Sequence, residues 1–220
     1  MNRMKKDKGF TLVEMMIAIA VGMVVLSAVY TVFNLQNKLL GDQEQIAELH
    51  QNARIAMDMM VREISMAGYN QTTDPLTIPS LPRCTSALVA AGTSCVGITN
   101  AASDTITFTA DLNGNGSIAA DSSNPNENIT YSVYSSSGIP ALGRTSNGSR
   151  QPVAEYVESL LFTYDSATLE SIRQIKITIR ARTSNPDPGY TDPIYGDNYR
   201  RYTLSSFAFP RNLSLQTAIN

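Results

Sequence analysis

Oxygen-bearing side chains recur at alternate positions in the segment DLNGNGSIAAD, a spacing that suits coordination of a calcium ion. Asp111 would be the first ligand of such a loop, followed by Asn113 and Asn115. Gly116 is the sixth residue, where a calcium-binding loop needs a sharp turn. The opening half of the segment therefore predicts a calcium site.

The closing half of this segment departs from the pattern. Ser122 occupies the twelfth position and cannot supply the bidentate carboxylate that completes the ligand shell, although Asp121 or Glu127 could substitute for it. Asn-Gly repeats also suit a hairpin turn, because both residue types tolerate positive φ angles. Two interpretations stay open: a calcium site formed by Asp111, Asn113, Asn115 and Asp121, or a plain turn.

Catalytic chemistry has few candidate residues in this chain. His50 is the single histidine, and no GxSxG segment, HExxH segment or phosphate-binding glycine loop occurs. The formal net charge of -2 provides no basic field for nucleic acid, and Arg200 and Arg201 are the only tight basic pair after the apolar run described next. We therefore expect no enzyme, no nucleic-acid partner and no cofactor apart from calcium.

A membrane-spanning helix is predicted from Phe10 to Phe33, where Glu14 is the only charged residue. At about 1.5 Å per residue, this run would reach roughly 36 Å as a helix, enough to cross a hydrocarbon core of about 30 Å. Basic residues precede it at positions 3, 5, 6 and 8. The positive-inside tendency therefore places the N-terminus in the cytoplasm and the remaining chain across the membrane.

The residues around the start of the apolar run suggest processing. A secretory signal has its apolar region before the cleavage site, whereas here KKDKG comes first. The residues KGFTLVEMMIAIAV closely resemble the processing site of type IV prepilins and type II secretion pseudopilins. The resemblance implies that a prepilin peptidase cuts after Gly9, that the new N-terminal Phe10 is methylated, and that residues 1–9 are a leader.

Glu14 stands at the fifth position of the chain that this cut would leave. A carboxylate inside an apolar helix is costly and usually faces a partner. The resemblance implies that Glu14 neutralises the N-terminal amine of a neighbouring subunit and so sets the register of assembly. A local alternative stays open, since Glu14 lies four residues after Phe10 and could reach the amine of its own chain.

Two cysteines, Cys84 and Cys95, lie in the part predicted to be exported, and the residues between them allow the chain to turn back. An oxidising compartment favours a disulfide, worth about 2–3 kcal/mol by loop entropy. The alternative is two free thiols. No metal quartet or CxxC pair surrounds them.

The helical pattern continues beyond the membrane span. Apolar residues recur at steps of three and four among polar ones, namely at Leu49, Ala53, Ala56, Met60, Ile64 and Ala67. Gly68 predicts the end of the helix. We therefore expect a leader over 1–9, a helix over 10–68 that spans the membrane at 10–33, and an exported β-rich domain over 69–220.

Segments rich in Thr, Ile, Val, Tyr and Phe predict strands at 104–110, 128–134, 156–164, 173–182 and 202–209. The expected fold class is α+β: a long N-terminal helix, hydrophobic in its first half and amphipathic in its second, packed on a mostly antiparallel sheet as in type IV pilins. The turn-rich segment SNPDPGYTDPIYGDNYRRY precedes the last strand. It is either a subunit contact or a solvated loop.

Both ends of the exported part narrow the resemblance. LHQNARIAMDMMVREISMAGYN resembles the end of the first helix in PilW-type minor pilins and in J pseudopilins of type II secretion, and SSFAFPRNLSL resembles their closing strand, with Arg211 and Asn212 at its end. This implies a minor pilin that helps to start, and can cap, a type IV pilus together with other minor and major pilins and an inner-membrane assembly platform.

Two alternative functions accompany this expectation. One is a J-type pseudopilin of a type II secretion system, which sequence hardly separates from a minor pilin. The other is a membrane-anchored ligand- or DNA-binding subunit. The resemblance implies the inner membrane as the location, with the globular domain in the periplasm and later in the pilus or at its tip.

Overall fold

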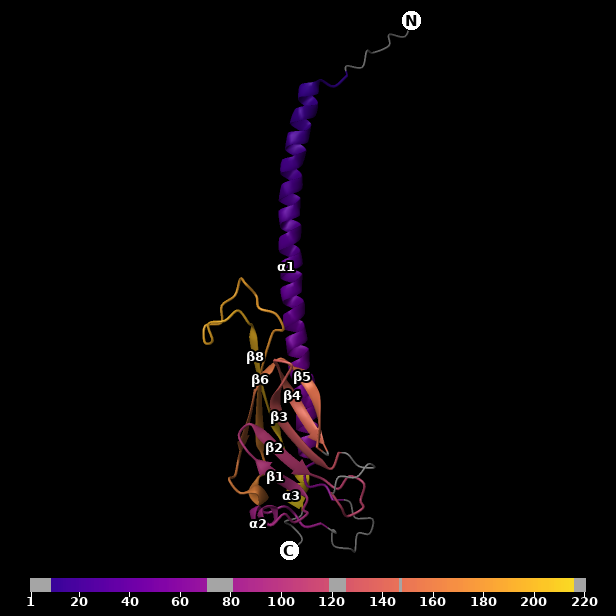
Figure 1. Cartoon of the computed structure of the whole chain (residues 1–220), viewed down its shortest axis with the longest axis vertical. Helices are drawn as coiled ribbons and strands as arrows, with labels where there is room; N and C mark the ends of the chain where they lie inside the picture. Colours follow the sequence, from indigo (N-terminus) through magenta and orange to yellow (C-terminus); the bar gives the residue numbers. More distant parts are fainter. Residues whose placement is uncertain (1–8, 71–80, 119–125, 147, 216–220) are drawn as a thin grey trace. The chain divides into compact units, whose positions relative to one another are not determined.

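The structure, a computed structural model (Figure 1), describes residues 9–70, 81–118, 126–146 and 148–215. Contacts divide the chain into two units, residues 1–44 and residues 45–220. The longest element, helix α1 (Leu12–Ser65), contributes to both units.

In the first unit, α1 exposes large apolar side chains from Leu12 to Leu40. Within the described residues, α1 is the one helix that is long and apolar enough to cross a membrane. A continuous helix satisfies its own backbone hydrogen bonds, which is what a lipid environment requires. The apolar run therefore takes the conformation that a membrane span needs.

The second unit contains two antiparallel sheets (Figure 1). One has five strands in the order β1-β2-β3-β4-β5, and the other has three in the order β6-β7-β8. The strands are β1 (Gly97–Ala101), β2 (Thr105–Thr109), β3 (Asn128–Ser136), β4 (Ile139–Ser146), β5 (Ser149–Glu155), β6 (Val157–Tyr164), β7 (Ile175–Arg182) and β8 (Arg201–Ala208). Short helical elements are α2 (Ser86–Ala90), η1 (Leu169–Ser171) and α3 (Arg211–Leu215).

One hydrophobic core joins the second part of α1 to both sheets. The predicted apolar stripe of the helix is buried: Leu49, Ala53, Ala56, Met60, Ile64 and Ala67 are each at most 6% exposed. From the sheets, the core includes Phe108, Tyr131, Leu142, Ile177 and Ile179. Because burying a large apolar side chain contributes about 1.5–3 kcal/mol, this shared core holds helix and sheets as one body. The expected α+β architecture is confirmed.

The five predicted strands are present as β2, β3, β6, β7 and β8, but β1, β4 and β5 were not expected. Proline and glycine in IPALGRTS and SRQPVAE obscured two of them. Pro152 is tolerated because β5 is an edge strand. Gly143 of β4 leaves room for the ring of Tyr134, since a Cβ there would lie 2.9 Å from that ring's Cδ1. The single sheet expected from sequence is therefore two sheets.

The C-terminal segment corrects another expectation. Strand β8 ends at Ala208, and Arg211 and Asn212 begin helix α3 instead of closing the strand. Pro210 lies between the two elements and cannot donate a strand hydrogen bond. Leu213 of α3 is 1% exposed and packs against Gly68, which follows the end of α1. Gly68 has a φ of +79°, and a Cβ at this position would lie 2.2 Å from Leu213 Cδ2, so a larger residue would not fit.

Candidate functional site

The predicted cleavage site lies just before α1. Gly9 and Phe10 are exposed and outside regular secondary structure, and the Phe10 side chain is 85% exposed. The basic leader up to residue 8 is outside the described residues. An exposed, non-helical segment is the form that a peptidase needs in order to reach a peptide bond.

Glu14 closes a capping box at the start of α1. The backbone N–H and the hydroxyl of Thr11 both donate to Glu14 Oε2 at 2.9 Å, and the Glu14 N–H donates to Thr11 Oγ1 at 3.3 Å. This satisfies donors that the first turn of a helix leaves free, and a carboxylate there also suits the helix dipole. Sequence reasoning missed this local partner, although the spacing T-x-x-E is its signal.

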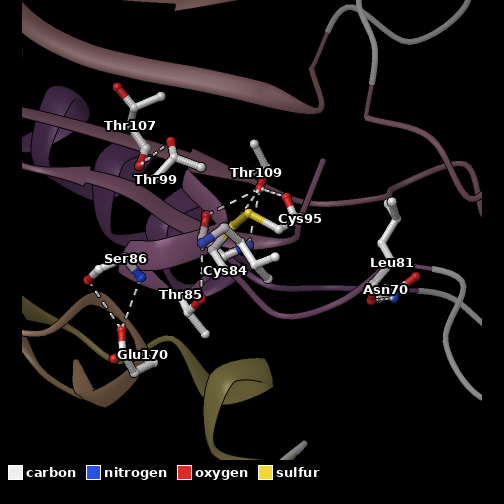
Figure 2. The surroundings of a disulfide bond; sticks show 12 residues. Asn70, Leu81, Cys84, Thr85, Ser86, Cys95, Thr99, Thr107, Thr109 and Glu170 are labelled. Carbon is white, nitrogen blue, oxygen red and sulfur yellow. Dashed lines mark hydrogen bonds between the residues drawn. A yellow bond between two sulfur atoms is a disulfide. The ribbon is translucent and has the colours of Figure 1, made fainter. Parts of the chain in front are cut away.

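Cys84 and Cys95 form a disulfide, as predicted (Figure 2). Both sulfurs are buried, and the Thr109 hydroxyl beside them donates to the carbonyl of Cys95 at 2.7 Å. The bridged segment contains α2, whose first turn is capped by Thr85 Oγ1, which accepts from the Leu88 N–H at 3.2 Å. Next to the bridge, Arg83 donates to the carbonyls of Leu213 and Glu170. The disulfide therefore anchors a loop that also holds the C-terminal helix.

The loop that begins at Asp111 is held by its own hydrogen bonds. Asp111 accepts from the backbone N–H groups of Gly114 at 2.8 Å and Gly116 at 3.1 Å. Asn113 and Asn115 each accept from the N–H two residues on. The two asparagine bonds form Asx turns, which order a loop through its own hydrogen bonds.

The predicted calcium donors are only partly placed by the structure. It brings Asp111, Asn113 and Asn115 into one loop, whereas Asp121 lies outside the described residues. Glu127 Oε1 accepts from the N–H groups of Leu112 and Asn113. The described residues contain no group of three or more His, Cys, Asp or Glu side chains that could hold a metal. Calcium binding at this loop stays a prediction.

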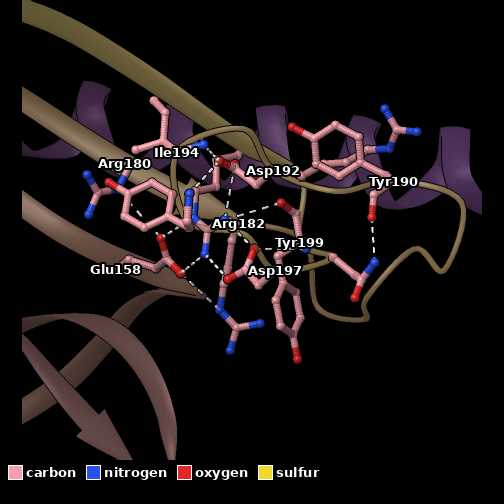
Figure 3. Close-up of polar contacts among 12 residues, drawn as sticks. Glu158, Arg180, Arg182, Tyr190, Asp192, Ile194, Asp197 and Tyr199 are labelled. Atoms are coloured by element: carbon pink, nitrogen blue, oxygen red, sulfur yellow. Dashed lines mark hydrogen bonds and ion pairs between the residues drawn. The ribbon is translucent and has the colours of Figure 1, made fainter.

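A cluster of charges and tyrosines orders the long loop between β7 and β8 (Figure 3). Its centre is Arg201, whose side chain is 9% exposed. Arg201 pairs with Glu158 of β6 at 2.7 Å, and with Asp192 at 3.1 Å and Asp197 at 2.6 Å from the loop. Arg180 and Arg182 of β7 also pair with Glu158, at 3.5 and 3.4 Å.

The pKa values of this cluster follow its hydrogen bonds. Those donated by Arg201 hold the pKa of Asp197 at about 2, below its usual value. Backbone donation from Ile194 lowers the pKa of Asp192, and the bonds to Asp197 and Glu158 raise the pKa of Arg201. All three groups therefore stay charged at neutral pH.

Tyrosine rings cover the arginines of the cluster. The Arg201 guanidinium lies 4.2 Å from the ring centroid of Tyr195, and that of Arg182 lies 3.9 Å from the centroid of Tyr199. Arg200 pairs with Asp187 at 2.8 Å. The basic pair at 200–201 is thus engaged within the chain, which does not favour the nucleic-acid alternative. Sequence spacing alone could not reveal that Glu158 of β6 meets arginines from both β7 and β8.

A second polar cluster fixes α1 to the five-stranded sheet. Arg144 of β4, 7% exposed, donates to Glu63 of α1 at 2.9 Å, and the hydroxyl of Tyr131 donates to Glu63 at 2.6 Å. Burial raises the pKa of the Tyr131 hydroxyl well above its usual value, and Glu63 adds to the shift. His50 has a packing role, since its ring stacks on that of Tyr202 with centroids 4.1 Å apart.

Comparison with known proteins adds two family matches. The model described as "Prokaryotic N-terminal methylation motif" matches residues 4–30, and the model described as "Prepilin peptidase-dependent protein B" matches residues 42–194. No curated protein matches the chain significantly. Among solved structures, the chain is similar to the type IV-like pilin TTHA1219 from Thermus thermophilus, with 11% identity, a TM-score of 0.44, and coverage of 75% of this chain and 98% of that one.

Proposed function

Because the chain belongs to the prepilin peptidase-dependent protein B family, we propose that it is a minor pilin that helps to start, and caps, a type IV pilus. It is a pilin-like structural protein and a substrate of the prepilin peptidase, not an enzyme. The proposal concerns its role within the filament. It rests on the processing segment joined to a membrane-length helix and a large globular unit.

The processing segment is the observation that carries this proposal. The methylation motif covers residues 4–30, and Gly9 and Phe10 are exposed directly before α1. Cleavage there removes the basic leader but keeps the apolar helix as an anchor. The product is a membrane-held subunit with a free amine at Phe10, which is the form that helix-to-helix assembly would use.

Glu14 would act in that assembly. Its carboxylate is held at the start of α1 by Thr11, within the first turn of the helix. After cleavage, the amine of a neighbouring subunit brings a positive charge to the same depth in the membrane. In a medium of low dielectric constant such a pair attracts strongly, so Glu14 would select neighbours in the correct axial register.

Location and partners follow from the same proposal. The helix anchors the chain in the inner membrane with its N-terminus in the cytoplasm, and residues 69–220 form the periplasmic part that later enters the pilus or its tip. The disulfide between Cys84 and Cys95 suits an oxidising compartment. The partners are other minor and major pilins, the prepilin peptidase and the inner-membrane assembly platform.

Intact-mass analysis of the membrane-extracted protein tests the processing step. The expected product lacks residues 1–9 and carries one methyl group on Phe10. An intact leader would reject the proposal at its first step. The Gly9→Val variant is a control, since it replaces the glycine that precedes the predicted cut and should therefore keep the leader.

Gene deletion separates the pilus role from a J-type pseudopilin role. We expect loss of surface pili with normal secretion of exoproteins, and restoration by the wild-type gene but not by Glu14→Ala. Loss of secretion with normal piliation would instead support the J-type pseudopilin. If piliation and secretion both stay normal, the ligand-binding alternative becomes the better explanation.

A further inference from the structure

The three-stranded sheet has one face in the core and one face outside it. Along the strands, Leu160, Ile179 and Leu204 share a register position on the core face. The intervening rows therefore lie on the opposite face, because successive side chains alternate. These rows are Ser159, Arg180 and Thr203; Leu161, Thr178 and Ser205; and Thr163, Lys176 and Phe207. We call this the outer face.

The outer face carries two of the exposed large apolar side chains of the second unit. Leu161 is 49% exposed and Phe207 is 47% exposed. Phe209 continues the row beyond β8, with its ring centroid 6.5 Å from that of Phe207. By contrast, none of the exposed large apolar residues of the described chain lies in β1 to β5. Apolar groups gathered on one face of a soluble domain mark a contact surface.

The loop between β7 and β8 extends the outer face with a preordered tip. Tyr195 lies over Arg180, 4.9 Å from its guanidinium, and Ile194 beside it is 82% exposed. Asp192 accepts from the N–H groups of both residues at 2.8 and 3.1 Å, which closes the turn. An exposed apolar side chain on a turn that is already ordered loses little entropy when a partner covers it.

The charge of the outer face limits which partner fits. Strands β6, β7 and β8 contain four cationic residues, Lys176, Arg180, Arg182 and Arg201, but only one carboxylate, Glu158. The loop neutralises the end near Arg201, and no ion pair within the described residues involves Lys176. A second copy would bring a second Lys176 to the contact, and like charges across an interface are costly.

We propose that the outer face of the β6-β7-β8 sheet, together with Ile194 and Tyr195, binds the globular domain of a different pilin-like subunit whose surface is apolar and acidic. This deepens the proposed function, on which it rests, by naming the surface through which a minor pilin selects a non-identical neighbour. Leu161, Phe207 and Ile194 supply the apolar contact area. Lys176, which is exposed, selects an acidic partner and disfavours self-association.

Site-specific photocrosslinking tests the location and the partner class. The full-length chain, with p-benzoylphenylalanine at Leu161, is co-expressed pairwise with each other prepilin-motif subunit of the same genome. A matched control carries the crosslinker at Arg150, an exposed residue of β5 in the other sheet. We expect a crosslink to a non-identical subunit from position 161 and none from position 150.

Substitutions test the physical basis of the contact. Phe207→Ser should reduce the crosslinked product about fivefold or more, since truncating an interface aromatic residue is costly. Lys176→Glu should reduce it about tenfold, whereas the matched reversal Arg150→Glu should leave it unchanged. All three residues are exposed, so the melting temperature of each variant should stay close to that of the wild type.

Other outcomes overturn the proposal. A crosslink to a second copy alone, to lipid alone, or equally from positions 161 and 150 would reject it, as would a Lys176→Glu variant that crosslinks like the wild type. In each case, normal removal of the leader and normal piliation would show that the minor-pilin function stands while this surface assignment fails. An intact leader would instead mean that the function itself is wrong.

Discussion

Replacing Arg144 by methionine should destabilise the globular unit through the carboxylate that remains on α1. Glu63 would keep the Tyr131 hydroxyl, at 2.6 Å, as a donor but would lose its cation. Removing one partner of a buried ion pair costs about 3–5 kcal/mol. Because the Glu63 side chain is 22% exposed, water offsets part of this, and we expect a loss of about 2–3 kcal/mol.

Urea unfolding of the mature full-length protein in detergent micelles measures this loss. Tyrosine fluorescence suits the purpose, since the chain has ten tyrosines and no tryptophan. In thermal unfolding followed by the same fluorescence, a loss of about 2–3 kcal/mol should lower the melting temperature of a unit of this size by about 4–12 °C. Arg150→Met is the matched control, because this exposed arginine lies 4.9 Å from the Tyr134 ring centroid and its loss should cost less than about 1 kcal/mol.

The triple variant Glu63→Met, Tyr131→Phe and Arg144→Met separates two explanations of the loss. If the cost comes from an uncompensated charge, removing the whole polar cluster should restore most of the stability, as apolar replacements of buried ion pairs often do. An Arg144→Met variant as stable as the wild type would refute the reasoning. If the triple variant is no more stable than Arg144→Met, the loss of stability comes from packing instead.

Three further predictions concern the disulfide, acid and calcium. Reduction of Cys84–Cys95 should lower the free energy of unfolding of the wild type by about 2–3 kcal/mol and lower its melting temperature. The melting temperature of the double serine variant should not change when reductant is added. Asp197 has a folded pKa of about 2, below its ordinary 3.8, so its stabilising effect is present above that ordinary value and is lost as pH falls toward 2. The stability difference between wild type and Asp197→Asn should therefore be present at pH 5 and vanish near pH 2, and a constant difference would contradict this. The calcium hypothesis predicts a higher melting temperature in about 1 mM calcium than in chelator, and Asp111→Ala should abolish this difference. If calcium does not raise the melting temperature of the wild type, the loop is a plain turn.

Local sequence patterns were enough to predict the long helix and the strands with regular alternation. The stripe from Leu49 to Ala67 has the period of a helix, and strand β7 alternates apolar and polar residues over its length. The sequence pattern did not predict strands β4 and β5, because glycine and proline, here Gly143 and Pro152, disfavour strands in isolation. Their pairing supplies the missing stabilisation: Tyr134 fills the space above Gly143, and an edge position tolerates Pro152.

The sequence by itself was enough to predict the processing segment, the membrane-length helix and the disulfide, because each depends on residues that are close along the chain. Only the tertiary structure decided which charges meet. Glu158, Asp192, Asp197 and Arg201 come from separate strands and a loop, and Glu63 meets Arg144 across 81 positions of sequence. The outer face is of the same kind, because register between strands, not spacing within one strand, brings Leu161 and Phe207 to one surface.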